Sequence, residues 1–372
     1  MLHEPRIGRD SFAGLSEAIA AHAPAHDANG SFPQEAFEEL AMRGHLGRPP
    51  IAVGQAADLL HLLSAVGRGD LSVGRIFEGH VNALVLIDRF GTAHQRETAF
   101  RNASAEATYG VWNTDAPSNP LVLESGSLSG AKNFASGVDG LACAIVTVTL
   151  AEGRQMILLP TSVLTVDRSW WKPSGMRASG SHIISVENLN VSDEMFLGAP
   201  DTYIREPLFS GGAIRFVAVQ TGGIHAIFDC AVEHLRRTGR AGNPYQSQRI
   251  ALMGAALQTA YDWLLRGAEA WEQAENDPED KAAANRLIAT TQAARAVIER
   301  SAMTVLELAE QGVGAAGFNA PHPLERLDRD LRTYLRQPNP DGSLASLGDA
   351  ITAGAWGPSF PRNLIAAIAE PR

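Results

Sequence analysis

Four side chains are candidates for acid–base chemistry. His80, in the segment EGHVNAL, falls in a predicted helix, and an imidazole that titrates near neutral pH can accept or release a proton. His182 ends the segment RASGSH, His322 lies between two prolines, and Glu78 is a further carboxylate. Each histidine has a structural alternative, because a packing or surface histidine has the same local sequence. We take His80 as the candidate catalytic residue.

The composition limits the classes of protein that the chain can belong to. It has 372 residues, of which 45% are hydrophobic, so two or three domains with a large buried core are expected. The net charge of −10 is dispersed, which argues against nucleic acid or a membrane surface as the main partner. Cys143 and Cys230 are the only cysteines and form no paired motif, which excludes a disulfide framework and a four-cysteine zinc site. This cysteine usage suits a reducing cytoplasm, and no run of ~18 apolar residues is present that would span a bilayer, so we expect a cytoplasmic protein. We also expect no metal.

Three zones of different periodicity follow one another. Residues 1–107 have apolar residues at helical spacing, and residues 108–208 contain short β-branched or aromatic runs between glycine-rich turns. AEGR, residues 151–154, is typical of a hairpin connection. Residues 209–372 return to helical spacing, with three long helices and a fourth that Pro338 and Pro340 end. The predicted fold is a multidomain α+β protein: a helical N-terminal domain, a barrel-like β-domain and a C-terminal four-helix bundle.

Helices, a β-domain and a four-helix bundle, in this order, resemble the acyl-CoA dehydrogenase superfamily. Three segments agree with its motifs. GAKNFASG resembles the family's Gly-x-Lys-x-Trp-Ile-Thr-Asn strand, with Phe134 at the tryptophan and Ser136 at the threonine. GMRASGSH is similar to Gly-x-Arg-x-Ser-x-Thr, and EQGVGAAGFNAPHPLERLDRD is similar to the stretch Gln-x-x-Gly-Gly-x-Gly-Tyr that leads to Arg-Asp.

The resemblance implies an FAD held between the β-domain and the bundle. Trp112 and Thr114 would lie on the strand beside the isoalloxazine, and Phe134 and Ser136 at the flavin's face and N5 edge. These aromatic residues on strands have core packing as their alternative.

A neighbouring subunit would complete the site. Gln311 and Gly314 would meet the pyrophosphate across a dimer interface, where a bare glycine N–H approaches a phosphate closely. Arg237 matches an arginine that contacts the pyrophosphate. The resemblance and the apolar bundle surface predict a homodimer or homotetramer.

The usual catalytic carboxylate is missing from both of its positions. In the dehydrogenases the tenth residue counted from the arginine of Arg-Asp is a glutamate, and counting from Arg329 reaches Pro338. Other members carry the glutamate just before an arginine early in the first bundle helix, where this chain has Ile214 and Arg215. A positioned base contributes roughly 10²–10⁴-fold to a rate. Ordinary acyl-CoA dehydrogenation is therefore in doubt.

Three functions remain open. The first is an FAD-dependent oxidoreductase that acts on an acyl thioester or related small molecule with an atypical or absent base. The second is a flavin-dependent monooxygenase that receives reduced flavin from a separate reductase and needs a dry pocket more than a glutamate. The third is a non-catalytic binding protein that keeps the fold. The retained segments GAKNFAS and QGVGAAGF argue against the third.

Overall fold

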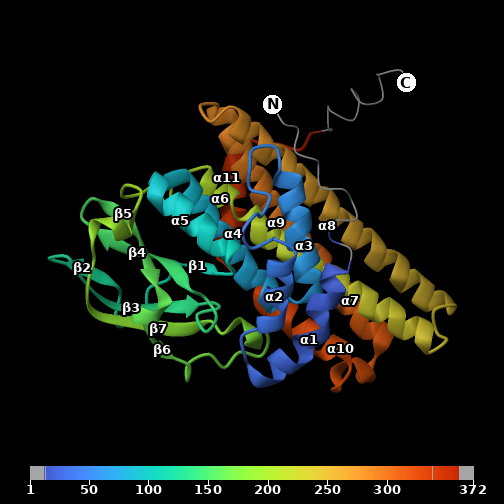
Figure 1. The fold of residues 1–372 in the computed structure, drawn as a ribbon. Helices are drawn as coiled ribbons and strands as arrows, with labels where there is room; N and C mark the ends of the chain where they lie inside the picture. Colours follow the sequence, from blue (N-terminus) through green and yellow to red (C-terminus); the bar gives the residue numbers. More distant parts are fainter. Residues whose placement is uncertain (1–11, 13, 337, 360–372) are drawn as a thin grey trace.

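The computed structural model describes residues 12, 14–336 and 338–359. Strands gather on one side and helices on the other (Figure 1), in the order helices, strands, helices that the sequence predicts. No helix in these ranges is long and apolar enough to cross a membrane.

Five helices precede the first strand. The α4 helix is buried along most of its length, because apolar residues cover nearly its whole surface, and the Asp70 side chain caps its start by accepting from the Val73 N–H. A capping box at Thr92 begins α5. The helices are α1 (Leu15–Asn29), α2 (Gln34–Met42), α3 (Ala56–Gly69), α4 (Leu71–Phe90) and α5 (Ala93–Ser104).

The strands form two four-stranded sheets. One has the order β1-β4-β5-β8, with β1 and β4 parallel, and the other has the order β2-β3-β7-β6 and is antiparallel. The predicted hairpin is confirmed, since Leu150 pairs with Gly153 across a two-residue turn. The strands are β1 (Tyr109–Trp112), β2 (Val122–Glu124), β3 (Ser127–Ala135), β4 (Cys143–Leu150), β5 (Gly153–Pro160), β6 (Thr165–Asp167), β7 (His182–Asn190) and β8 (Phe196–Leu197).

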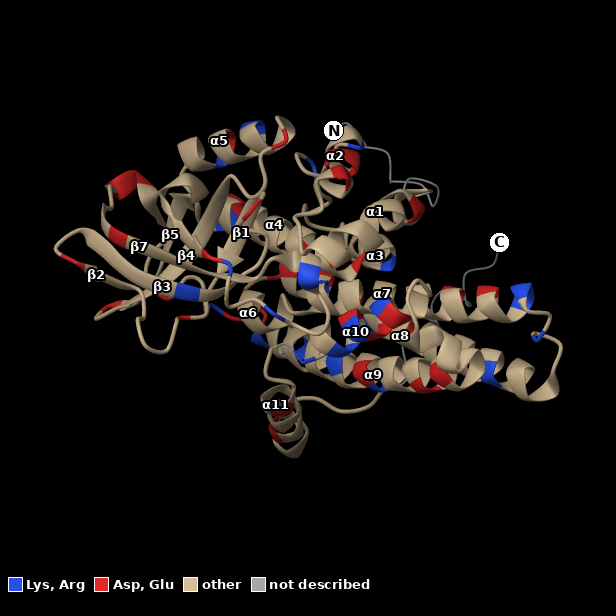
Figure 2. Cartoon of the chain, turned by 90° about the horizontal axis from the view of Figure 1, so that it is seen from below, with Lys and Arg blue, Asp and Glu red and all other residues tan. Residues whose placement is uncertain are grey.

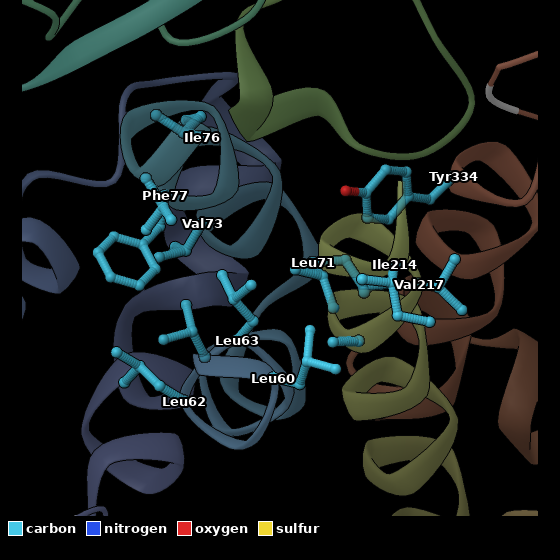
Figure 3. Packing of buried hydrophobic residues seen from close by; sticks show 14 of the residues in the cluster. Leu60, Leu62, Leu63, Leu71, Val73, Ile76, Phe77, Ile214, Val217 and Tyr334 are labelled. Carbon is cyan, nitrogen blue, oxygen red and sulfur yellow. The ribbon is translucent and has the colours of Figure 1, made fainter. Parts of the chain in front are cut away.

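The C-terminal helices pack on α3 and α4 through a continuous apolar core. Leu60 and Leu63 of α3 lie near Val217 of α7 in this core (Figure 3). The helices are α6 (Leu208–Gly211), α7 (Ile214–Arg237), α8 (Pro244–Asn276), α9 (Lys281–Val313), α10 (Pro323–Tyr334) and α11 (Pro340–Thr352).

Glycines allow α3 and α7 to approach at backbone distance. A Cβ added at Gly222 would lie 2.0 Å from the Ser64 carbonyl oxygen, and one at Gly67 would lie 2.3 Å from the Val219 carbonyl oxygen. Gly222 is therefore required by packing in the middle of a helix that glycine otherwise weakens.

The fourth bundle helix differs from the prediction. The α10 helix ends at Tyr334, before the prolines, and Pro340 begins a new helix, α11, at its first turn. Gln337, the last residue of the predicted helix, lies outside the described residues. The α11 helix packs on α9 and projects from the other helices (Figure 2). Two consecutive helices thus replace the single one expected.

Arg329 and Asp330 bind partners outside their own pair. Arg329 binds Asp27 at 2.8 Å and Glu325 at 2.6 Å. Asp330 is buried, binds Arg326 at 3.3 Å and accepts from the Met176 N–H at 2.6 Å. The two residues therefore tie α10 to α1 and to the loop before β7.

Candidate active site

A bulge in β3 turns Phe134 outward. The register of β3 against β7 shifts between Lys132 and Ala135, and Phe134 takes a φ of 57° with 41% of its surface exposed. An aromatic side chain in the left-handed region carries strain of about 1–3 kcal/mol, and such residues concentrate at functional sites. The Phe134 ring meets Trp170 edge-on, with centroids 5.0 Å apart. The bulge therefore builds an exposed aromatic corner on the β-domain.

Ser136 begins a chain of three buried hydroxyls beside this corner. Its Oγ lies 2.8 Å from Ser181 Oγ, and Ser181 Oγ lies 2.9 Å from Ser179 Oγ. Ser179 Oγ donates to the Met176 carbonyl at 2.8 Å. Gly137 N–H donates to the Ser179 carbonyl at 2.7 Å, so the bulge and the GMRASG loop are joined by backbone as well.

Strand β1 and the residues that follow it make hydrogen bonds to the bulge of β3. Trp112 is buried, and its indole N–H donates to the Ser136 carbonyl at 3.2 Å. Thr114 is exposed, and its carbonyl accepts from the Asn133 N–H at 2.9 Å. Of the four residues expected along the flavin ring, Phe134 and Thr114 are thus accessible, Ser136 is nearly buried, and Trp112 acts on Ser136 through a hydrogen bond.

Two polar atoms near Phe134 lack partners. Asn133 Oδ1 and Trp171 Nε1 are buried and have no hydrogen-bond partner among the described residues. Asn133 precedes Phe134 in the chain, and the Trp171 ring centroid lies 6.3 Å from that of Phe134. Each such group calls for an explanation, and a functional role is one of them. A flavin ring carries both carbonyl acceptors and an N–H donor, so the residues present fit this group.

The second position of the dehydrogenase base holds Ile214, and a buried cation follows it. Arg215, at the start of α7, is buried and binds Glu78 at 3.3 Å and Asn82 at 2.6 Å. Arg75 binds the other Glu78 oxygen at 3.1 Å. Burial lowers the pKa of Arg215, and the charge of Glu78 opposes this shift. Both Glu78 oxygens therefore have guanidinium partners, so Glu78 is not a free base.

Pro338, the first position of the dehydrogenase base, also has an arginine beside it. The Arg295 guanidinium donates to the Pro338 carbonyl and to Ser343 Oγ. Its centre lies 5.1 Å from the Phe216 ring, and burial lowers its pKa. Pro338 has no acid–base side chain, and its carbonyl accepts from a guanidinium.

His80 lies inside the protein. It is fully buried on α4; its Nε2 donates to the Leu46 carbonyl at 2.9 Å, and its Nδ1 accepts from the Tyr109 N–H at 3.1 Å. Burial lowers its pKa to about 4. Both ring nitrogens are satisfied by backbone, so the geometry favours the packing role over the acid–base role that we considered for it.

The residues expected at the pyrophosphate lie at one end of the bundle. Arg237 is the exposed last residue of α7, and Gln311 in the last turn of α9 accepts from Arg249 at 3.4 Å. Gly314 has a φ of 80°, with open space where a Cβ would stand. His322 Nε2 lies 3.0 Å from His234 Nδ1. Within the described ranges, no hydrogen bond joins this group to Ser136 or Phe134, so their cooperation across subunits stays a prediction.

The comparisons agree with the predicted family. Residues 202–335 match the model of the acyl-CoA dehydrogenase C-terminal domain. A butyryl-CoA dehydrogenase structure from Megasphaera elsdenii superposes with a TM-score of 0.80 at 17% identity, covering 95% of this chain and 100% of that one. The chain has the acyl-CoA dehydrogenase fold, and its residues 202–335 match that family's C-terminal domain.

Relatives with other named activities align along most of their length. L-evernosamine nitrososynthase from Micromonospora sp. is 27% identical, with 87% of this chain and 84% of the relative covered. Dibenzothiophene monooxygenase from Mycolicibacterium goodii is 24% identical, with 78% and 79% covered. The structure of TdsC from Paenibacillus sp. A11-2 with FMN and indole superposes with a TM-score of 0.81 at 16% identity, covering 94% of this chain and 98% of that one. The expectation of an enzyme is confirmed.

Sequence reasoning missed part of the aromatic corner and of the hydroxyl chain. Trp170, Trp171, Ser179 and Ser181 all lie in or beside the segment WWKPSGMRASGS. The adjacent tryptophans before a recognised motif were a signal for the first pair. The serines belong to the motif itself, but only the structure shows that their hydroxyls reach Ser136.

Proposed function

We propose that the protein is a flavin-dependent monooxygenase that uses reduced flavin from a separate reductase. Bound reduced flavin supplies the chemistry that passes one oxygen atom of O₂ to a substrate. The observation that carries the proposal is that Pro338 and Ile214 stand at the two positions where dehydrogenases hold their base, while both oxygens of Glu78 are bound by Arg75 and Arg215. Neither proline nor isoleucine can remove the α-proton of a thioester, whereas oxygen transfer does not require a carboxylate there.

This chain's residues have definite parts in the proposal. Phe134 and Trp170 provide an aromatic surface for the flavin ring. Trp171 provides a hydrogen-bond donor without a partner, and Asn133 provides an acceptor without a partner. Gly314, Gln311 and Arg237 of a second subunit contact the phosphates. The substrate is a small molecule with an oxidisable nitrogen or sulfur, as the names of the nitrososynthase and dibenzothiophene monooxygenase relatives suggest. The flavin is FMN or FAD, and FAD was the sequence-based prediction.

Oxidation of an acyl thioester is the second candidate. The same aromatic corner and the same expected phosphate contacts support it. Glu78 on α4 would be its candidate base, and this carboxylate binds Arg215 of α7. Its two arginine partners oppose this role, because they hold the carboxylate in the form of an ion pair.

The two candidates separate in a pair of experiments. Octanoyl-CoA added anaerobically to protein loaded with oxidised FAD should leave the flavin absorbance unchanged. Protein given reductase-supplied reduced flavin, dibenzothiophene and ¹⁸O₂ should yield a product that carries one ¹⁸O. Rapid anaerobic bleaching by octanoyl-CoA would establish the dehydrogenase instead.

Flavin binding itself is tested at Gly314. Gly314→Glu should abolish binding, because it puts a carboxylate where phosphate is expected. Gly314→Ala is the matched control, since it brings the same backbone strain at a φ of 80° without the charge. Equal affinities of the two variants would rule out a phosphate contact at this residue.

A further inference from the structure

A recess between α7, α9 and α11 has the features of a small-molecule site. It holds about 350 Å³ of space, part of it open to solvent, and such sites begin at roughly 300 Å³. Phe216 of α7, Leu335 at the end of α10 and Leu344 of α11 give the recess apolar walls, and Gln292 and Arg295 of α9 give it polar groups. The two polar residues are three positions apart, so they lie on the same face of α9.

Arg295 is a cation without an acidic partner among the described residues. Its guanidinium donates to two neutral oxygens, the Pro338 carbonyl and Ser343 Oγ. Glu299, which also lines the recess, binds Arg336 instead. Two of the five N–H groups of Arg295 are used, which leaves three for a ligand. Partly buried cations are normally paired, so an anion is the ligand group that this guanidinium favours.

Gln292 adds a hydrogen-bond acceptor to the same recess. Its side chain is 8% exposed, and its Nε2 donates to Ser346 Oγ at 3.1 Å. Its Oε1 is buried and has no hydrogen-bond partner in the described part of the chain, and an unmade buried hydrogen bond is costly. A ligand that satisfies both residues carries an anion for Arg295 and a hydrogen-bond donor for Gln292.

We propose that this recess binds a small carboxylate that has an apolar body and a hydroxyl group. The two oxygens of a carboxylate match the fork of one guanidinium, so the carboxylate accepts from Arg295. The hydroxyl donates to Gln292 Oε1, and the apolar body packs against Phe216 and Leu335. Flavin takes no part in this binding, so the inference stands apart from the proposed function.

The ligand would also fasten α11 to the other helices. The α11 helix has no buried residue, packs on α9 and projects from the bundle (Figure 2). Because the recess has walls from α7, α9 and α11, a bound molecule contacts all three helices at once. Binding should therefore slow amide hydrogen exchange in α11.

The test is calorimetric titration of the full-length protein with 3-hydroxybenzoate, which carries the three required groups. We expect one saturable site per chain. 3-Hydroxybenzamide keeps the shape and the hydroxyl but lacks the charge, and benzoate lacks the hydroxyl. Each should bind about tenfold or more weakly, equal to ~1.4 kcal/mol. These comparisons use the unmodified protein, so they do not depend on whether a variant folds.

Three variants assign the contacts. Arg295→Gln should weaken binding of 3-hydroxybenzoate about tenfold or more, whereas Arg300→Gln removes the same charge from an exposed position of α9 and should change nothing. Gln292→Leu keeps Arg295 and its contacts to α11, and should abolish the advantage of 3-hydroxybenzoate over benzoate. Absence of saturable binding, equal binding of the amide or of benzoate, or unchanged affinity in both Arg295→Gln and Gln292→Leu would overturn the inference.

Discussion

Burial of His80 predicts a specific loss of stability in acid. Burial lowers the pKa of this imidazole from the ordinary 6.5 to about 4 in the folded protein. Between these values the unfolded chain takes up a proton that the folded protein excludes, so stability falls as the pH drops from about 6.5 toward 4. Two-state linkage with these pKa values gives a loss of about 2 kcal/mol between pH 7.5 and pH 5 from this one residue.

The measurement compares wild type with His80→Gln in urea unfolding at both pH values. The glutamine amide can donate to the Leu46 carbonyl and accept from the Tyr109 N–H, the two partners of the imidazole, but it does not titrate. Burial also lowers the pKa of His45 and His61, and both remain in the variant and cancel in the comparison. The penalty of the substitution should shrink by about 2 kcal/mol at pH 5. Equal losses in both proteins would show that His80 is protonated in the fold and accessible to solvent.

Three further outcomes are expected. Gly222→Ala should destabilise the protein by about 3 kcal/mol or more in urea unfolding, because the new Cβ would lie 2.0 Å from the Ser64 carbonyl oxygen; Gly254→Ala in α8, with no atom nearer than 3.9 Å, should be neutral or stabilising. Phe134→Asn should raise stability by about 1 kcal/mol by relieving the positive φ while weakening flavin binding, and unchanged flavin affinity would remove Phe134 from the site. Light scattering at micromolar concentration should give a dimer or tetramer mass, because Leu265 and Tyr245 on α8 are exposed; a monomer mass would contradict this.

The sequence predicted those parts of the fold that depend on local patterns. AEGR gave the hairpin because glycine and a short polar turn suffice to reverse a strand. The long helices followed from apolar spacing. The α11 helix was missed because proline both ends one helix and suits the first turn of the next, and Pro340 does the second.

The sequence predicted only those residues of the candidate site that lie in recognisable motifs. Phe134 and Ser136 were predicted from the segment GAKNFASG. Their accessibility and their hydrogen-bond partners depend on the bulge in β3, which the residue types of this segment do not indicate. His80 and Trp112 were ambiguous, because the same residue types line sites and fill cores. The close approach of α3 requires Gly222. The sequence of α7 alone does not indicate this, because the neighbouring helix comes from a distant part of the chain.

An arginine lies beside each of the two base positions, Pro338 and Ile214, so the difference from the dehydrogenases involves more than the missing glutamate. A carboxylate at position 338 would lie next to Arg295, whose guanidinium already binds the backbone there. A neighbouring cation lowers the pKa of a carboxylate and makes it a weaker base. Next to the other position, Ile214, the Arg215 side chain binds Glu78 and Asn82 and is buried against Trp271, with its guanidinium carbon 5.4 Å from the Trp271 ring centre. The surroundings of each vacant position are therefore organised around a positive charge, as expected for chemistry in which no α-proton is removed.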